Sequence, residues 1–377
     1  MSTTTNIYKE DIDFVALGRE DSDFGKLLNS NGQLDFSDPK SVQQLTKSLL
    51  KRDFGLKLIL PDDRLCPPVP NRLNYILWLQ DLVDTSSDTY TDSYRPDRQV
   101  HGLDIGTGAS CIYPLLGCTQ RPLWKFTGTA QGPLIPLDEI GFDSLDFTLC
   151  NPPFYIPQQK TWLPLRLLSS VHHLQLARAP TQRCLSTIIE QLKENKVDNY
   201  AVTEFVQGSR TRRWAVAWSF GDRRPSMNVS RGCGSLQKSL LPFPAEQQIT
   251  IPASNKTTVA RSVHDTLSES MTLWTWDSQN FAGVGFCDQA VWSRKSRRGR
   301  ENARIVSRAS GSHVKDEEWP KDMAFGFKIS LEEFEGDATG SHVIVRWVKG
   351  HNSVLFESFC GMMKRKLSRL TGALDQD

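Results

Sequence analysis

The hydrophobic pattern of residues 38–83 predicts two helices joined by a short strand and a proline-rich connection. Asp38-Pro39 is a good helix start, because proline suits the first helical position. Apolar residues then recur at helical spacing as far as Phe54-Gly55, which predicts the end of the helix. Residues 56–60 alternate apolar and polar side chains like a strand. Residues 72–83 again have the spacing of an amphipathic helix.

The next part of the chain alternates strand-like and helical patterns. The predicted strands cover residues 101–105, 124–129, 145–150, 200–207 and 213–220, with a helix at 185–196. Strands that alternate with helices are typical of an α/β fold with a parallel sheet. The last two strands follow each other closely, so we expect an antiparallel pair that closes this sheet.

A change in composition divides the chain after residue 221. Residues 222–257 are rich in Pro, Ser, Gly and Asn and predict a linker. Beyond it, residues 271–276, 324–331 and 342–348 alternate like strands, and 353–370 has helical spacing. The predicted parts are a helical region over 1–100, an α/β core over 101–221, the linker, and a small α/β domain over 258–370.

The bulk composition excludes several classes of protein. The 377 residues include 45 basic and 43 acidic ones, a net charge of +2, so nucleic-acid binding would need local basic patches. The eight cysteines are scattered without a CxxC pair, which favours reduced thiols in a cytosolic or nuclear protein and makes a zinc site improbable. We find no signal-peptide pattern and no apolar stretch of membrane-spanning length, so we expect no membrane partner and no metal.

Two motifs at the ends of predicted strands carry the candidate chemistry. Asp104-x-Gly106-x-Gly108 follows the strand at 101–105. Alone it is more often an ordinary strand-to-helix turn, but its glycines would let a ligand approach the backbone. Asn151-Pro152-Pro153-Phe154 follows the strand at 145–150. The Asn151 side-chain oxygen and the Pro152 carbonyl could accept both N–H groups of a planar amine, with Phe154 stacked on the base. Together the motifs predict methyl transfer to an amino nitrogen.

Other charged residues have an ordinary and a functional interpretation. Most arginines lie on surfaces, but Arg72 could also bind a ligand carboxylate in a bidentate manner. The basic run of Arg294, Lys295, Arg297, Arg298 and Arg300 is either a solvated face, an RNA-phosphate contact or a nuclear-import signal. Lys364-Arg365-Lys366 with Arg369 is a second such cluster. His172-His173 has no partner at ligand spacing and is interpreted as structural.

The sequence resembles the methyltransferase-like protein 16 family and its fungal and bacterial relatives. The segments that carry the resemblance lie at 6–9, 34–39, 53–56, 72–76, 102–117, 150–154, 203–208 and 213–215. They cover about half of residues 1–221, and the chain resembles a fungal member from which segments are missing. The match is much looser in the C-terminal region, which resembles an RNA-binding extension.

The resemblance implies a class I S-adenosylmethionine-dependent methyltransferase with a Rossmann-like sheet, here incomplete. It implies a nuclear enzyme that forms N6-methyladenosine in U6 small nuclear RNA or ribosomal RNA, with RNA contacts from residues 1–100. Arg72 and Gly106 would contact S-adenosylmethionine, and Asp104 and Gly108 belong to the same predicted donor site. Asn151, Pro152, Pro153 and Phe154 would hold an adenine flipped from its stack.

The sequence departs from the family pattern on both sides of the predicted base site. The family places an acid about 20 residues beyond the glycines to bind the donor ribose, but no Asp or Glu occurs from Ile105 to Leu137, and Ala130 stands at the expected position. Residues 130–144 are too few for a crossover with a helix and a further strand. Residues 147–189 also contain no acid, and 158–184 resemble nothing in the family. The stretch 130–184 is therefore atypical.

We hypothesise that this chain is a mis-spliced or mis-predicted form of an active parent. One segment is lost near Ala130, and another is replaced after Tyr155. A transcript that encodes this chain without interruption would contradict that hypothesis. Two other functions stay open. One is an RNA-binding protein with a degenerate, inactive methyltransferase domain. The other is a protein-glutamine or DNA-adenine methyltransferase, whose sites more often carry Tyr where Phe154 stands.

Overall fold

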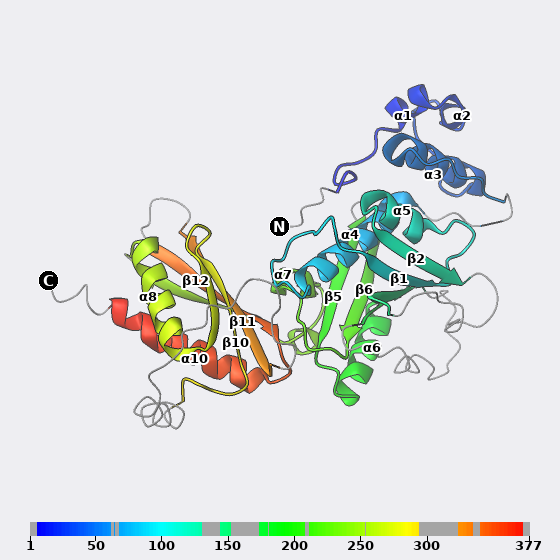
Figure 1. The fold of residues 1–377 in the computed structure, drawn as a ribbon. Helices are drawn as coiled ribbons and strands as arrows, with labels where there is room; N and C mark the ends of the chain where they lie inside the picture. Colours follow the sequence, from blue (N-terminus) through cyan, green and yellow to red (C-terminus); the bar gives the residue numbers. More distant parts are fainter. Residues whose placement is uncertain are drawn as a thin grey trace, which may run out of the picture. The chain divides into compact units, whose positions relative to one another are not determined.

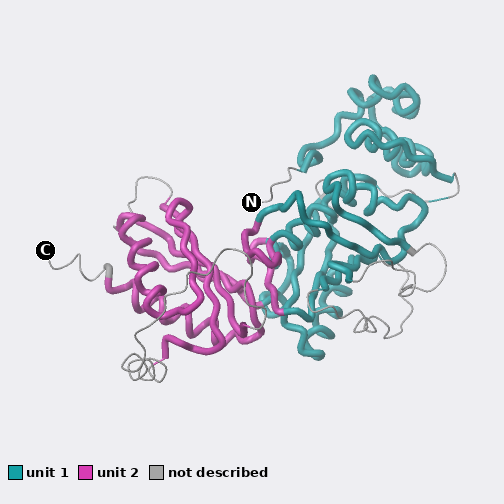
Figure 2. The backbone as a smooth tube through the Cα atoms, viewed as in Figure 1, with its two compact units in different colours: residues 1–84, 93–221, 229–242 teal, residues 85–92, 222–228, 243–377 magenta. Residues whose placement is uncertain are grey.

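The computed structural model describes residues 6–61, 64, 68–129, 144–151, 173–179, 181–207, 211–252, 254–293, 323–334 and 340–371. The chain forms two compact units and passes between them several times (Figures 1 and 2). Unit 1 comprises Met1–Asp84, Ser93–Gly221 and Val229–Pro242. Unit 2 comprises Thr85–Asp92, Asp222–Asn228 and Phe243–Asp377.

Unit 1 begins with helices. They are α1 (Phe14–Glu20), α2 (Ser22–Gly25), α3 (Pro39–Phe54) and α4 (Val69–Thr85). Both predicted ends of α3 are confirmed. The Asp38 side chain accepts hydrogen bonds from the backbone N–H groups of Lys40 and Ser41, and Gly55 terminates the helix at φ 68°. Residues 56–60 do not form the strand that we predicted, because no described strand lies beside them to pair with their backbone.

A seven-stranded sheet forms the centre of unit 1, in the order β2-β1-β3-β4-β6-β5-β7. Its strands are β1 (Val100–Ile105), β2 (Trp124–Thr129), β3 (Phe147–Cys150), β4 (Leu174–Ala179), β5 (Tyr200–Gln207), β6 (Thr211–Ser219) and β7 (Arg231–Gly232). Strands β2, β1, β3 and β4 are parallel, and β6 runs antiparallel between β4 and β5. Among the described residues no strand pairs with the outer edge of β2. The predicted gap at residues 130–143 lies outside them.

Helices cover both faces of the sheet in unit 1. Side chains of a strand alternate between faces, so Leu176 of β4 packs on one face with Leu73 of α4 and Leu116 of α5 (Ile112–Gln120). The next residue, Ala177, packs on the other face with Ile189 of α6 (Gln182–Glu194). This sandwich of helices around a mainly parallel sheet confirms the predicted α/β class.

Strand β4 lies within residues 158–184, a stretch that resembles nothing in the family and for which we predicted no strand. Leu174–Ala179 form a central strand of the sheet. β4 pairs in parallel with β3 and antiparallel with β6. Beside it, His173 is buried, with its ring nitrogens 3.1 Å from the Leu145 carbonyl oxygen and 3.2 Å from the Thr148 hydroxyl. The structural interpretation of His173 is therefore confirmed, whereas His172 lies outside the described residues.

Unit 2 is built on a five-stranded antiparallel sheet in the order β8-β12-β11-β10-β9. Its elements are β8 (Glu246–Pro252), α8 (Lys256–Ser270), β9 (Leu273–Asp277), β10 (Ala282–Cys287), β11 (Phe325–Glu333), β12 (Gly340–Lys349) and α10 (Ser353–Thr371). Val263 of α8 and Phe359 of α10 pack with Trp347 and Phe327 in one core.

The predicted linker over 222–257 is replaced by ordered elements. It contains α7 (Met227–Ser230), β7, the 3-10 helix η2 (Lys238–Leu240), β8 and the start of α8. β7 pairs with β5 in unit 1, and β8 pairs with β12 in unit 2. Proline and glycine mark turns between these short elements, which composition alone does not distinguish from a linker.

Residues 85–92 belong to unit 2 and not to the predicted N-terminal region. The Tyr90 ring packs 5.1 Å from that of Phe286. Lys328, on β11, donates a 2.6 Å hydrogen bond to the Asp92 carboxylate, and Arg346 of β12 also forms an ion pair with it. Tyr90 and Asp92 adopt φ of 56° and 61°, which is unfavourable for residues other than glycine and is maintained here by these contacts.

The close approach of β1 and β3 gives a first prediction. A Cβ at Gly102 would lie 2.2 Å from the Phe147 ring, which is buried between Trp124 and Phe126. We expect Gly102→Ala to lower the free energy of unfolding by about 1–3 kcal/mol through overpacking. Urea denaturation measures the effect. Gly234→Ala is the control, since its Cβ would have ordinary contacts at 3.7 Å, and an equal loss in both variants would contradict the prediction.

Candidate functional site

The glycine motif and Asn151, the first residue of the second motif, lie at the carboxyl ends of neighbouring strands of the sheet. β1 and β3 run parallel with Ile105 opposite Cys150, so Gly106 and Asn151 follow at neighbouring strand ends. β1 is flanked by β2 and β3, which places the reversal of strand order between β1 and β3. Ligands of open α/β sheets bind outside the carboxyl ends of the strands at such a point. The topology therefore brings Asp104 and Asn151 into one site.

Asp104 is buried without a hydrogen-bond partner among the described residues. Its side chain is 0% exposed, and neither carboxylate oxygen accepts a hydrogen bond there. Removal from water raises its pKa to about 7, and the positive charge of Arg72 opposes that rise. A buried carboxyl group without donors is unfavourable for stability, which makes Asp104 a candidate for binding a cationic ligand group.

The turn after β1 needs its glycines and leaves space beside them. Gly106 and Gly108 adopt φ of 77° and 65°, a region that other residues rarely adopt. No described atom lies within 4 Å of a Cβ built at either position. The turn then leads into α5, whose N-terminal N–H groups receive no side-chain cap from Cys111. A ligand can therefore approach the backbone closely here, as predicted for a donor site.

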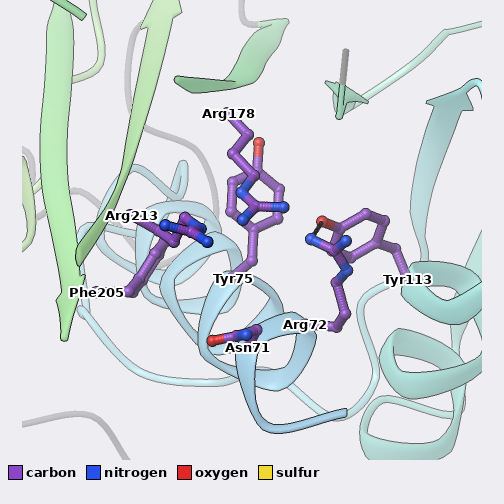
Figure 3. Close-up of a pocket in the computed structure, with 7 residues that line it drawn as sticks. All are labelled: Asn71, Arg72, Tyr75, Tyr113, Arg178, Phe205 and Arg213. Carbon is purple, nitrogen blue, oxygen red and sulfur yellow. Dashed lines mark hydrogen bonds between the residues drawn. The ribbon is translucent and has the colours of Figure 1, made fainter. Parts of the chain in front are cut away.

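A small cavity next to the carboxyl ends of these strands is lined by arginines and aromatic rings (Figure 3). Its lining residues are Asn71, Arg72, Tyr75, Tyr113, Arg178, Phe205 and Arg213. Arg72, on α4, is only 9% exposed and donates a 3.0 Å hydrogen bond to the Tyr113 hydroxyl. The ordinary interpretation of Arg72 as a surface residue is therefore wrong.

Arg178 joins this cavity to Asn151. Ala177 of β4 lies opposite Cys150 of β3. The residues that follow them, Arg178 and Asn151, are therefore neighbours. The Arg178 guanidinium donates a 3.3 Å hydrogen bond to the Asn151 side-chain oxygen. Burial, together with the charges of Arg72 and Arg213, lowers its pKa to about 10.

Sequence reasoning missed most of the cavity lining. Tyr75 and Tyr113 lie within helical patterns, where aromatic residues usually belong to the core. Arg178 had a usable signal, because it is the only charged residue of β4. Arg213 lies in a segment that carried the family resemblance, but we assigned it no role.

The described residues fit an S-adenosylmethionine donor. Its amino-acid end carries an ammonium and a carboxylate group. This site offers a buried carboxylate that has no hydrogen-bond partner among the described residues, and a buried arginine. Asp104 would hold the ammonium group and Arg72 the carboxylate group. Gly106 and Gly108 provide the open backbone turn. The expected ribose position, Ala130, lies outside the described residues.

The remaining predicted site residues have different outcomes. Pro152, Pro153 and Phe154 lie outside the described residues, as does the basic run from Arg294 to Arg300. Lys364, Arg365 and Arg369 are exposed on α10. The described residues contain no group of His, Cys, Asp or Glu that could hold a metal ion. None of the described helices is long and apolar enough to cross a membrane.

The doubly wound sheet, with a glycine turn and a buried carboxylate at its switch point, defines a class I S-adenosylmethionine-dependent methyltransferase fold. A family model described as RNA methyltransferase matches residues 3–135. The U6 small nuclear RNA (adenine-(43)-N(6))-methyltransferase of Schizosaccharomyces pombe is 25% identical over 398 residues, which cover 89% of this chain and 96% of the relative.

Two further relatives are more similar over shorter stretches. The RNA N(6)-adenosine-methyltransferase mettl16 of Danio rerio is 31% identical over 332 residues, or 70% of this chain and 67% of the relative. The crystal structure of the N-terminal domain of human METTL16 is 33% identical, covers 58% of this chain and 98% of the domain, and superposes with a TM-score of 0.49. The chain belongs to the METTL16 family of RNA N6-adenosine methyltransferases.

Proposed function

We propose that this protein transfers the methyl group of S-adenosylmethionine to N6 of an adenine in a structured RNA of the U6 type. The donor supplies an electrophilic methyl group when bound. Asp104 would hold its ammonium group and Arg72 its carboxylate group, and the Asn151 amide oxygen would accept a hydrogen bond from an N–H of the target base. Adenine N6 is weakly basic, so positioning of the nitrogen, rather than a strong general base, dominates the rate.

The observation that carries this proposal is the parallel register of β1 and β3. In this register Asp104, which has no hydrogen-bond partner in the part of the chain that the structure describes, and Asn151 lie at adjacent strand ends. Methyl transfer needs the target nitrogen, the methyl carbon and the donor sulfur in one line. Two neighbouring strand ends provide fixed positions for the donor and the target base. Curated relatives that act on U6 small nuclear RNA favour that RNA.

A tritium-transfer assay tests the proposed function. Labelled S-adenosylmethionine is incubated with a U6-like hairpin, with the same hairpin carrying guanine at the target adenine, and with a ribosomal RNA fragment. We expect label only in N6-methyladenosine of the adenine hairpin. Asn151→Ala should lower the rate roughly 10- to 100-fold, because the target amine loses a hydrogen-bond acceptor. An unchanged rate in that variant would contradict the assigned role.

The second candidate function is RNA binding without transfer. It is favoured by the absence of any acid between Ile105 and Leu137, where a ribose-binding carboxylate is expected. Electrophoretic mobility shifts with the same hairpins separate the two. Binding of the hairpin with no label transferred, at saturating donor, would support this alternative. Ribosomal RNA as the substrate would be supported if only the ribosomal fragment were labelled.

The nucleus is the proposed location, because the run from Arg294 to Arg300 has the composition of a nuclear-import signal. A fluorescent fusion in which these basic residues are replaced by glutamine tests it. Loss of nuclear fluorescence is the expected result. Retention in the nucleus would contradict the role of this run.

A further inference from the structure

Asn151 already has a hydrogen-bond partner in this chain. Its side-chain oxygen accepts a 3.3 Å hydrogen bond from Arg178. A guanidinium group donates and never accepts, so the amide must turn its oxygen toward Arg178. Under the proposed function, the Asn151 side-chain oxygen is the atom that accepts a hydrogen bond from an N–H group of the target adenine.

The contact is built into the sheet. Arg178 and Asn151 follow the paired residues Ala177 and Cys150 of two parallel neighbours. Arg178 is also paired across to Ala215 of β6, and its side chain is largely buried, at 8% exposure. Hydrogen bonds on both sides of β4 limit how far the Arg178 backbone can move. The guanidinium must therefore swing or share the oxygen when a base enters.

The charge of Arg178 opposes methyl transfer as well. The amine nitrogen gains positive charge as its bond to the methyl group forms and the donor's carbon–sulfur bond breaks. Arg72, Arg178 and Arg213 all line the same cavity (Figure 3). A like charge beside a developing cation raises the barrier, more so in a site shielded from water.

We propose that Arg178 restrains methyl transfer in this chain by occupying and polarising the Asn151 oxygen. This inference rests on the proposed function, and Arg178 is the residue that controls the rate of methyl transfer. Atoms and charge balance in the transfer. The methyl group moves from sulfur to N6, the sulfonium becomes a neutral thioether, and the N6 proton passes to solvent.

Two variants separate hydrogen bonding from charge. Arg178→Met keeps an apolar stem of similar length and removes both the donor and the charge. Arg178→Gln keeps a neutral donor. Arg183→Met, at an exposed position of α6, is the control. Single-turnover transfer to the U6-like hairpin is measured with enzyme in excess, and hairpin affinity is measured separately by mobility shift.

The expected result is a transfer rate about tenfold above wild type for Arg178→Met, a smaller increase for Arg178→Gln and no change for Arg183→Met. The increase should appear in the rate constant and not in RNA affinity. If wild type transfers and Arg178→Met is equally fast or slower, Arg178 does not restrain the reaction and the proposed function stands. If neither wild type nor any variant transfers, the proposed function fails and the inference with it.

Discussion

Asp104→Asn is expected to weaken S-adenosylmethionine binding by roughly 30- to 1,000-fold, the effect of truncating one partner of a buried, hydrogen-bonded charge pair. The same variant should be more stable than wild type without ligand, because Asp104 is buried with no hydrogen-bond partner among the described residues. A loss of affinity combined with a gain in stability identifies a residue that serves the ligand. Isothermal calorimetry and thermal melts measure the two effects.

The pH dependence follows from the same residue. Burial raises the pKa of Asp104 from 3.8 to about 7. In the unfolded chain it loses its proton at the lower value, so the stability of ligand-free protein falls as pH rises from about 4 to 7. Donor affinity should instead increase through pH 7 as the carboxylate forms. In Asp104→Asn both of these pH-dependent contributions should be absent. If the donor affinity of this variant still rises through pH 7, another titrating group causes the rise.

Asp84→Ala should have the largest effect on stability. Asp84 of α4 accepts two hydrogen bonds from Arg121, of 2.9 and 2.8 Å, and both side chains are almost fully buried. Breaking such a pair leaves an uncompensated buried charge and costs about 3–5 kcal/mol. The Arg121 guanidinium also lies 3.8 Å from the Tyr94 ring centroid, so its position is held from a second side.

Urea denaturation of three variants checks this expectation. The double variant Asp84→Ala/Arg121→Met should recover much of the loss, since it removes the unpaired charge and keeps the apolar stem. Asp23→Ala, in the fully exposed pair with Lys26, should change stability little. A double variant as unstable as Asp84→Ala would show that packing, and not the unpaired charge, dominates at this site.

Much of the fold could be predicted because its signals are local. The cap residues of α3 satisfy backbone groups within one turn, so Asp38 and Gly55 mark its ends in any context. β4 was not predicted because a central strand depends on partners, and its neighbours β3 and β6 are far away in the sequence. They lie 24 and 32 residues away, counted from Cys150 to Leu174 and from Ala179 to Thr211. Residues 56–60 have a strand pattern but no such partner among the described strands.

The class of fold, the family and the two motifs at strand ends could be predicted from the chain alone, because they depend on local patterns and residue order. Which side chains meet depends on tertiary contacts. Only the register of β1, β3 and β4 places Asn151 beside Arg178, and only packing removes Asp104 and Arg72 from water. Burial and proximity arise from residues far apart in the chain, so no local pattern could reveal the pKa of Asp104 or the contact that restrains Asn151.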